Sequence, residues 1–466
     1  MKTVRFLIFL ILWGVLASCS AEVDSSADFP AYTGTLDGYA YYHTTQREQN
    51  WEEDILFLAE AYLNGHPLLA DDSFYIKTWT FHGTNAETEY AYNNALLNPT
   101  LRRDFISQIN GLIAQTPQLS DTQIVFEMQR IIASLHDLHS SLNLNNCYTQ
   151  LLPLSLECLG SEEGYDYYVT DAPSEEYENI LYGKLVSIND VPIDEIVRQL
   201  SAYVSSESEG FTAWYLSIGR PMIIKKEALQ VIGVVEESAE DAQLAFDLDG
   251  TTTTYRLPFV TQNDYEAMDR LSVRLADQNI PRYRYFPDKN YWFEALGEDI
   301  LYIRFYRMAI DPNQSLNDFV RDISVVLRDA PEPLDVVVDF RDNTGGTITE
   351  NPSLANAINQ YASQKVYLLM NESSVSAGVF APYSLKQMVE GSVLIGSPAG
   401  QFVRSFGSSE SFTLPNSGYP FQVSKGYYIM ASQDNEMPLM PDIRIYQNVE
   451  DYKAGKDTVL GYILEQ

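Results

Sequence analysis

The first part of the chain carries the hydrophobic spacing of amphipathic helices. From Trp51 onward, apolar residues recur at three- and four-residue steps until Gly65-His66-Pro67 interrupts the run. The same spacing returns twice, and Ser120 stands at the N-cap position before its last occurrence. The pattern predicts a helical region from Trp51 to about Leu144, with its later helices over 101–113 and 122–135.

The middle of the chain has the composition of short strands. Between about 150 and 260, β-branched and aromatic residues gather in short runs separated by turn residues. The segment 183–196 is the most distinctive of these. It predicts a strand, a turn at Asn189-Asp190, and a helix that continues to Leu200.

From about residue 290 onward, predicted strands and helices alternate. The strands lie over 300–305, 334–340, 366–370 and 392–395, and the helices over 316–327, 354–361 and 379–389. Such alternation implies crossover connections and an at least partly parallel sheet. The fold class expected is therefore α/β and α+β multidomain, with functional groups at the carboxyl ends of the parallel strands.

Composition narrows the possible functions. The 466 residues include 30 Lys and Arg against 64 Asp and Glu, a formal charge of −34, and 45% of them are hydrophobic. The hydrophobic fraction and the length support real cores in two or three domains. The negative charge argues against partners that carry phosphate, such as nucleic acid. Three cysteines exclude a disulfide-rich scaffold and a zinc site built from Cys. Cys147 and Cys158 could form a disulfide or remain as two buried thiols.

The N-terminus has the features of an export signal. Lys2 and Arg5 precede an apolar run over 6–16, which is too short to span a bilayer. The run ends in Leu16-Ala17-Ser18-Cys19, which resembles a bacterial lipobox. The resemblance implies removal of residues 1–18 and a lipid on Cys19; an ordinary secretory signal is the alternative. We therefore expect an exported lipoprotein of the cell envelope, held to a membrane only by its lipid.

Two segments after buried strands carry candidate chemistry. The strand 334–340 leads into 341–346, where Gly345 and Gly346 allow a tight turn and expose backbone N–H groups. The strand 366–370 leads into 371–378, which places serines at the start of a helix, where N–H groups stabilise a developing oxyanion. Taken singly, each pattern is more often structural.

The ordered set of segments resembles the S41 peptidase family, which includes the carboxyl-terminal processing and tricorn-type proteases. Residues 338–346 are similar to its Asp-Leu-Arg-x-Asn-x-Gly-Gly stretch, and 371–378 to the segment that holds its nucleophile. Further similarities lie at 135–140 (Asp-Gly-His-Thr), 183–196 (the PDZ-type module), 395–400 (strand and glycine loop), 440–443 (Pro-Asp) and 455–460 (Asp-x-x-Leu). The resemblance runs from about residue 50 to the end of the chain.

The resemblance assigns roles to particular residues. It makes Ser376 the nucleophile, which needs a base to take its proton. Processing proteases of the family use a Lys about 25 residues after the serine, but that position holds Gln401, and Arg404 stays protonated. The tricorn-like branch uses a His that corresponds to His139, and histidine titrates near neutrality. The resemblance therefore implies that His139 is the base.

The same resemblance completes the site. The N–H of Ala377 and that of Gly345 or Gly346 would hold the oxyanion. Glu436 is the nearest match to the acidic residue near the closing strand. We expect no cofactor and no metal.

Several observations support other interpretations. His139 could be a helix-end residue that only caps carbonyls. His136 and His139 could suggest metal, although no further ligands are evident. The lysine is missing, and Val379 and Leu138 replace residues usual in the family.

We therefore predict a lipid-anchored serine endopeptidase that cleaves exported proteins or peptides through an acyl-enzyme. A catalytically inactive lipoprotein of the same fold, which binds peptides or apolar ligands, is the main alternative, and a glycan-handling surface protein is a third. The predicted segments are 1–18 (signal peptide), 19–50 (tether), 51–148 (helical domain), 149–262 (PDZ-like module) and 263–466 (S41-like core).

Overall fold

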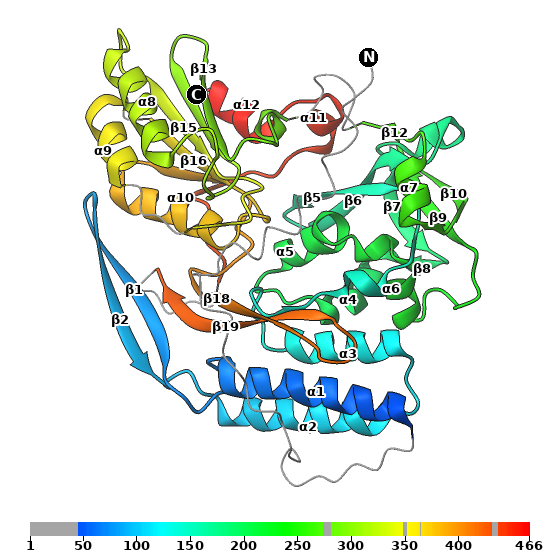
Figure 1. Cartoon of the computed structure of the whole chain (residues 1–466). Helices are drawn as coiled ribbons and strands as arrows, with labels where there is room; N and C mark the ends of the chain where they lie inside the picture. The colour runs from blue at the N-terminus through cyan, green and yellow to red at the C-terminus, as the bar shows by residue number, and fades with distance from the viewer. Residues whose placement is uncertain (1–44, 274–280, 348–351, 364, 431–436) are drawn as a thin grey trace.

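A computed structural model describes residues 45–273, 281–347, 352–363, 365–430 and 437–466. The predicted signal peptide, the lipidation site Cys19 and the predicted acidic residue Glu436 lie outside this range. Three helices form one end of the molecule, an α/β layer forms the other, and a β-rich part lies beside them (Figure 1).

The three predicted N-terminal helices are present. They are α1 (Gln46–Gly65), α2 (Pro99–Gln115) and α3 (Asp121–Ala133). Each begins at a side chain that accepts a backbone N–H: Thr45, Asn98 and Ser120, respectively. The predicted cap at Ser120 is confirmed, and Gln123 completes a capping box there.

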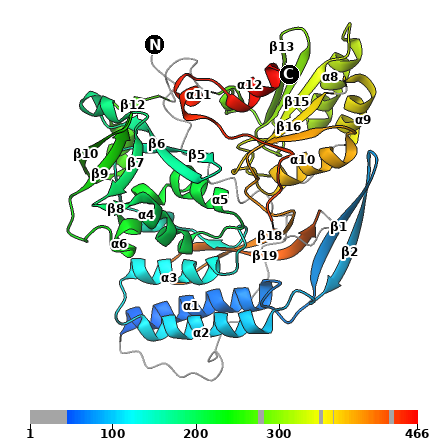
Figure 2. The same ribbon diagram turned by 180° about the vertical axis from the view of Figure 1, so that it is seen from behind.

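The prediction of an all-helical region is wrong between α1 and α2. This segment forms a hairpin of β1 (Phe74–His82) and β2 (Asn85–Asn93), turned at Gly83 with a φ of 59°. β1 pairs in parallel with β19 (Pro420–Ile429), whose other neighbours are β18 (Arg404–Thr413) and β3 (Ser141–Leu142). Pairing with a strand so far along the chain decides the conformation here. The hairpin runs along the flank of the molecule towards α10 (Figures 1 and 2).

The predicted strand, turn and helix over 183–200 are confirmed. β7 (Lys184–Ile188) turns at Asn189 and Asp190, with φ of 47° and 63°, into β8 (Val191–Pro192) and α4 (Ile193–Leu200). They belong to a seven-stranded sheet with β5 (Ser155–Ser161), β6 (Gly164–Ala172), β9 (Asp241–Leu248), β10 (Thr251–Pro258) and β12 (Leu271–Ser272). Around this sheet lie β4 (Gln150–Leu151), β11 (Val260–Thr261), α5 (Glu209–Trp214), α6 (Lys226–Val231) and α7 (Gln262–Ala267).

The third sheet has six strands and is mostly parallel, as predicted. Its order is β13 (Tyr291–Leu296), β14 (Ile300–Phe305), β15 (Asp335–Asp339), β16 (Val366–Met370), β17 (Val393–Gly396) and β20 (Ile443–Arg444). Only the pairing of β13 with β14 is antiparallel.

Helices cover both faces of the parallel sheet, as its continuous apolar strands require. Val336, Val338 and Leu368 pack against α8 (Leu316–Asp329), α9 (Pro352–Tyr361) and α10 (Ala377–Met388). Val337 and Leu369 face α12 (Thr458–Leu464), which follows α11 (Val449–Lys453). The site described below lies where the strands of this buried sheet end.

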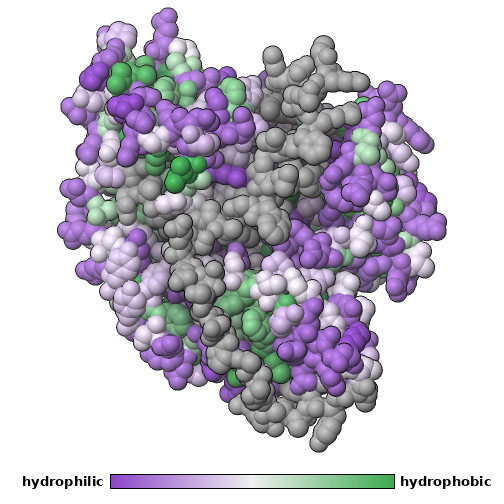
Figure 3. All heavy atoms as spheres, in the orientation of Figure 1, coloured by the Kyte–Doolittle hydropathy of each residue, from purple (hydrophilic) through white to green (hydrophobic). Residues whose placement is uncertain are grey.

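The surface of the view in Figure 3 is mainly hydrophilic, as the charge leads one to expect. Within the described part of the chain, no helix has the length and apolar character needed to cross a bilayer. Cys147 and Cys158 are both buried as free thiols, which decides between the two states considered for them.

Candidate active site

An arginine joins two sequence motifs at the end of β15. Arg341 Nε lies 3.0 Å from Asp339 Oδ2, and its Nη1 and Nη2 donate to Asp457 at 2.8 and 2.7 Å. All three residues are buried or nearly so, and Tyr302 also donates to Asp339 at 2.7 Å. This explains why the closing motif at 455–460 accompanies the one at 338–346: Asp457 neutralises the arginine that follows the strand.

A second carboxylate ties the loops after β15 and β16 together. Asp342 Oδ1 accepts Asn371 Nδ2 and Ser373 Oγ, both at 2.8 Å, and the Asp342 N–H donates back to Asn371. Burial alone would raise the pKa of Asp342, but Arg284 and these hydrogen bonds hold it below its usual value. The two segments that carry the predicted chemistry are therefore fixed to each other.

Ser376 stands at the first turn of α10, beside the loop that contains Gly345. Its backbone has a φ of 56° and ψ of −126°, an uncommon conformation for a residue with a side chain. A Cβ at Gly345 would lie 2.7 Å from Ser376 Cβ and 3.1 Å from its Oγ, so only glycine fits at that position. The serine hydroxyl thus lies directly against the paired-glycine loop.

The predicted oxyanion donors differ in what they bind. Gly345 N–H donates to Asn343 Oδ1 at 2.9 Å. Gly346 passes so close to Met308 that a Cβ would lie 2.1 Å from the Met308 carbonyl oxygen. The N–H of Ala377, the first residue of α10, has no acceptor among the residues that the structure describes. Ala377 is therefore the best placed of the three to receive a new negative charge.

His139 comes from the opposite side of the site, between α3 and β3. Its backbone N–H donates to Asp137 Oδ1 at 2.9 Å, and its carbonyl accepts Ser409 Oγ at 2.7 Å. The next strand, β3, pairs with β19. α3 ends at Ala133, so His139 lies beyond the helix and does not cap it.

Asp137 connects His139 to the first helix. His66 Nε2 lies 3.2 Å from Asp137 Oδ2, and Ser140 Oγ donates to the same oxygen at 2.5 Å. Burial raises the pKa of Asp137, but His66, His139 and Ser140 together bring it below its usual value. His66, at which the helical pattern of the sequence stops, therefore fixes the loop that carries His139.

Gln401 joins the two predicted catalytic residues. Its Oε1 accepts the backbone N–H of Ser376 through a short hydrogen bond, and its Nε2 lies 3.4 Å from His139 Nδ1. The neighbours of the two residues also pack together, because Leu138 and Val375 share a small cluster with Phe211. The structure thus brings His139 and Ser376 to the nitrogen and the oxygen of one buried carboxamide.

Glu207, which the sequence did not single out, completes this group. It lies before α5, accepts Gln401 Nε2 at 3.3 Å with Oε1, and accepts Phe402 N–H at 3.0 Å with Oε2. Burial and the nearby charge of Asp137 raise the pKa of Glu207 to about 8, against the opposing effects of Phe402 N–H, His139 and Gln401. Isolated acidic residues in a turn carry no recognisable motif, so it could not be found from the sequence.

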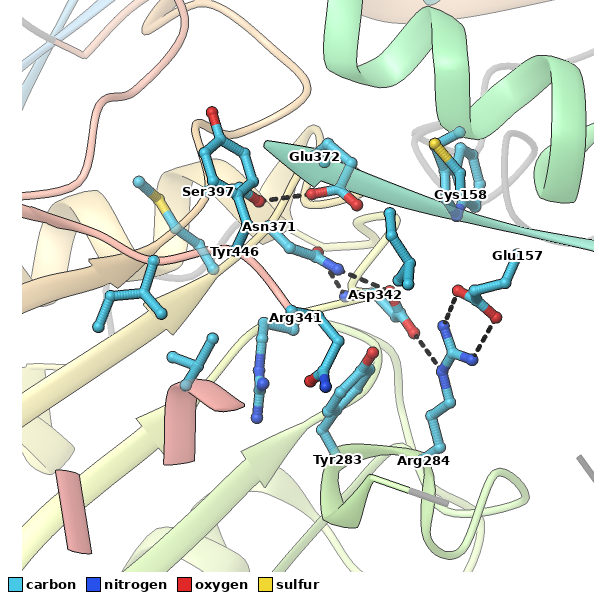
Figure 4. Close-up of a pocket in the computed structure, with 17 residues that line it drawn as sticks. Glu157, Cys158, Tyr283, Arg284, Arg341, Asp342, Asn371, Glu372, Ser397 and Tyr446 are labelled. Carbon is cyan, nitrogen blue, oxygen red and sulfur yellow. Dashed lines mark hydrogen bonds and ion pairs between the residues drawn. The ribbon is translucent and has the colours of Figure 1, made fainter. Parts of the chain in front are cut away.

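A small cavity of about 30 Å³ lies between the loop after β16, at Asn371 and Glu372, and the strand β5 (Figure 4). Arg284 lies in it between Glu157 and Asp342. Glu372 faces the cavity and binds Ser397 Oγ; burial raises its pKa to about 7. The charged side chains around the cavity are thus paired with one another or hydrogen-bonded.

The remaining predicted site residues can now be placed. His136 is exposed while His139 is buried, so the two histidines do not share a face. In the described part of the chain, no group of three or more His, Cys, Asp or Glu has a geometry that could hold a metal ion. Cys19 and Glu436 lie outside the described residues.

Comparison with known proteins identifies similarity in fold. No protein-family model matches the sequence, and no curated protein matches it. The class that the structure defines is a mixed α/β fold with several sheets.

Solved structures of CPAF, a chlamydial S41-like serine protease, share this fold over most of the chain. Mature CPAF in complex with lactacystin aligns with a TM-score of 0.56 and 11% identity, covering 90% of this chain and 98% of that one. Mature CPAF alone gives 0.55 and 12%, and a CPAF mutant 0.56 and 12%, each covering 88% of this chain and 95% of that one. At this identity the similarity concerns the fold alone.

Proposed function

We propose that this protein is a serine endopeptidase in which Ser376 is the nucleophile and His139 the base. The observation that carries the proposal is the position of Gln401, which binds the backbone of one residue and the ring of the other. The order of S41-like motifs and the CPAF-like fold support it.

The chemistry follows from these groups. Ser376 Oγ attacks the carbonyl carbon of the scissile peptide bond while the His139 imidazole takes the hydroxyl proton. The Ala377 N–H, at the positive end of α10, stabilises the oxyanion. The imidazolium then gives its proton to the leaving amine. Water, deprotonated by the same ring, releases the acyl group and restores the Ser376 hydroxyl.

Substrate and location are parts of the same proposal. The segment 183–196, with its PDZ-like strand, turn and helix, would bind an extended or C-terminal peptide by adding a strand to a sheet edge. The sequence at Cys19 suggests a lipid anchor in the bacterial cell envelope. The substrates would then be exported proteins or peptides.

A fluorophosphonate probe tests this function, because it reacts with activated serines. We expect the wild-type protein to be labelled and the Ser376→Ala variant not to be. Ser384→Ala is the matched control, since Ser384 lies buried in the same helix and its Oγ donates to the Ala381 carbonyl one turn earlier. Lactacystin, which is bound in the CPAF structure, serves as a competitor.

Failure to label the folded wild-type protein would favour the binding alternative. Gln401 at the position of the family lysine and the occupied N–H of Gly345 are the observations that favour it. In that case the protein would bind a peptide or apolar ligand without cleaving it. Binding of such a ligand that is unchanged by Ser376→Ala would support this reading.

A further inference from the structure

The side chain of Gln401 is fully buried and all of its polar atoms face the proposed site. Its carboxamide contacts three groups: the Ser376 N–H, His139 Nδ1 and a carboxylate oxygen of Glu207. A buried amide with this many partners has little freedom to rotate.

The direction of the amide follows from the chemistry of its partners. A backbone N–H can only donate, so the atom of Gln401 next to Ser376 must be the oxygen. The NH₂ group must then face His139 and Glu207. Its two hydrogens suit these two neighbours at the pH of the measurement below, which lies above the raised pKa of Glu207, because an ionised carboxylate can only accept.

Glu207 strengthens this orientation. Its second oxygen accepts the Phe402 N–H, so the carboxylate is held against the residue that follows Gln401. A reversed amide would turn its oxygen towards this carboxylate and its NH₂ group towards the Ser376 N–H, which are both unfavourable contacts.

The orientation fixes the ring proton of His139. A neutral imidazole has one N–H and one acceptor nitrogen, and the partner of one nitrogen decides the state of the other. Since Gln401 donates to Nδ1, the proton must be on Nε2. Asp137 Oδ1 lies 4.0 Å from Nδ1, beyond hydrogen-bond reach, and does not compete for a proton there.

We propose that Gln401, oriented by Glu207, is a positioning residue that sets the tautomer of His139 in the resting site. The inference rests on the proposed function and adds one step to its mechanism. The neutral ring can accept the Ser376 proton only at Nδ1, so the Gln401–His139 hydrogen bond must open before the hydroxyl proton moves. The same amide keeps its hold on the Ser376 backbone through its oxygen.

Nitrogen-15 NMR of the full chain labelled at histidine tests this directly. At about pH 9 an unperturbed imidazole is neutral, and the two ring nitrogens give different shifts and couplings. His139→Asn identifies the His139 signals. His66 is an internal reference, since its Nδ1 accepts Leu68 N–H at 3.2 Å and its proton is therefore also on Nε2.

The informative variant exchanges the two side chains: Gln401→Glu together with Glu207→Gln. It keeps the net charge and places a carboxylate against Nδ1, which should move the ring proton of His139 from Nε2 to Nδ1. Glu207→Gln alone is the matched control and should leave the proton on Nε2. His66 should be unchanged in both proteins, which also reports that they are folded.

The proton on Nε2 in the wild type and on Nδ1 in the exchanged variant supports the inference. A wild-type proton on Nδ1, or the same tautomer in both proteins, overturns it. The measurement needs no substrate, so its outcome is separate from probe labelling at Ser376. A labelled protein with the wrong tautomer loses only this inference, and an unlabelled protein with the expected tautomer loses only the proposed function.

Discussion

The two sides of the candidate site are built in different ways. The Ser376 side belongs to one parallel sheet, whose neighbouring strands β15 and β16 deliver their loops to the same edge. The His139 side is assembled from a loop after α3, the strand β19, and the separate residues Gln401 and Glu207. The first side should therefore contribute most to stability, and the second should affect reactivity more than folding.

Removing the charge of Arg341 should have the largest effect on stability. Arg341→Met removes the guanidinium that the buried Asp339 and Asp457 share, and we expect a loss of about 3–5 kcal/mol in the free energy of unfolding. Urea denaturation measures it. Arg321→Met, which removes an exposed arginine from α8, is the control and should not shift the midpoint. Equal midpoints for the two variants would show that the sheet edge does not depend on this network.

Gly345→Ala should affect both the stability and the reactivity of the Ser376 side. The new Cβ would meet Ser376 Cβ at 2.7 Å, in a backbone with a φ of 105°, so either the loop or the serine must move. We expect the labelling rate of Ser376 to fall at least about tenfold and the free energy of unfolding to fall by about 1–3 kcal/mol. Gly111→Ala, where a Cβ meets nothing within 4 Å, is the control and should label normally. Normal labelling of the Gly345 variant would contradict the packing described here.

Asp137→Asn should weaken the His139 side with a smaller loss of stability. The carboxylate of Asp137 accepts from three donors, on His66, His139 and Ser140, whereas the Asn side chain has only one acceptor oxygen. We expect a loss of about 1–2 kcal/mol and a reduced labelling rate. If thermal unfolding changes while labelling does not, Asp137 has no part in placing His139.

The pH dependence of stability should show the smallest effect. The pKa of Glu207 is raised from 4.5 to about 8, so the folded protein retains a proton that the unfolded chain releases above pH 4.5. Its contribution to stability therefore falls as the pH rises from about 4.5 to about 8. Glu207→Gln should remove this pH dependence of the free energy of unfolding. The effect should be on the order of 1 kcal/mol between these pH values, since Glu207 is half-buried and solvent screens its charge.

Melting temperatures of the wild type and of Glu207→Gln, measured at pH 5 and pH 8.5, give that difference. Glu372→Gln is a useful comparison, because burial raises the pKa of Glu372 to about 7 on the other side of the loop. A pH dependence that is the same in all three proteins would show that neither carboxyl is protonated in the folded state.

The Ser376 side could largely be predicted from the sequence. Apolar runs followed by Asp, Asn, Ser and paired Gly identify strands that end in polar turns, and parallel strands deliver those turns to one edge. The placing of Gly345 against Ser376 follows from that rule. The rule does not predict which acceptor each backbone N–H of these turns will bind. In the structure, the Gly345 N–H donates to Asn343 Oδ1.

The His139 side could be predicted only in part. The resemblance pointed to His139, but its surroundings depend on contacts between segments far apart in the chain. The β1–β2 hairpin was missed for the same reason, since its conformation is decided by pairing with β19. In the sequence, Gln401 was noticed only because it occupies the position of the family lysine. A single polar residue does not reveal which groups it will contact.

The rate constant of fluorophosphonate labelling in wild type and His139→Asn tests the central claim most directly, with mass spectrometry to locate the modified peptide. His136→Asn is the matched control, because His136 is exposed three residues earlier. We expect modification at Ser376 in the wild type and in the His136 variant at equal rates, and a reduction of about 100-fold or more without His139. Equal rates in all three proteins would contradict a base at His139.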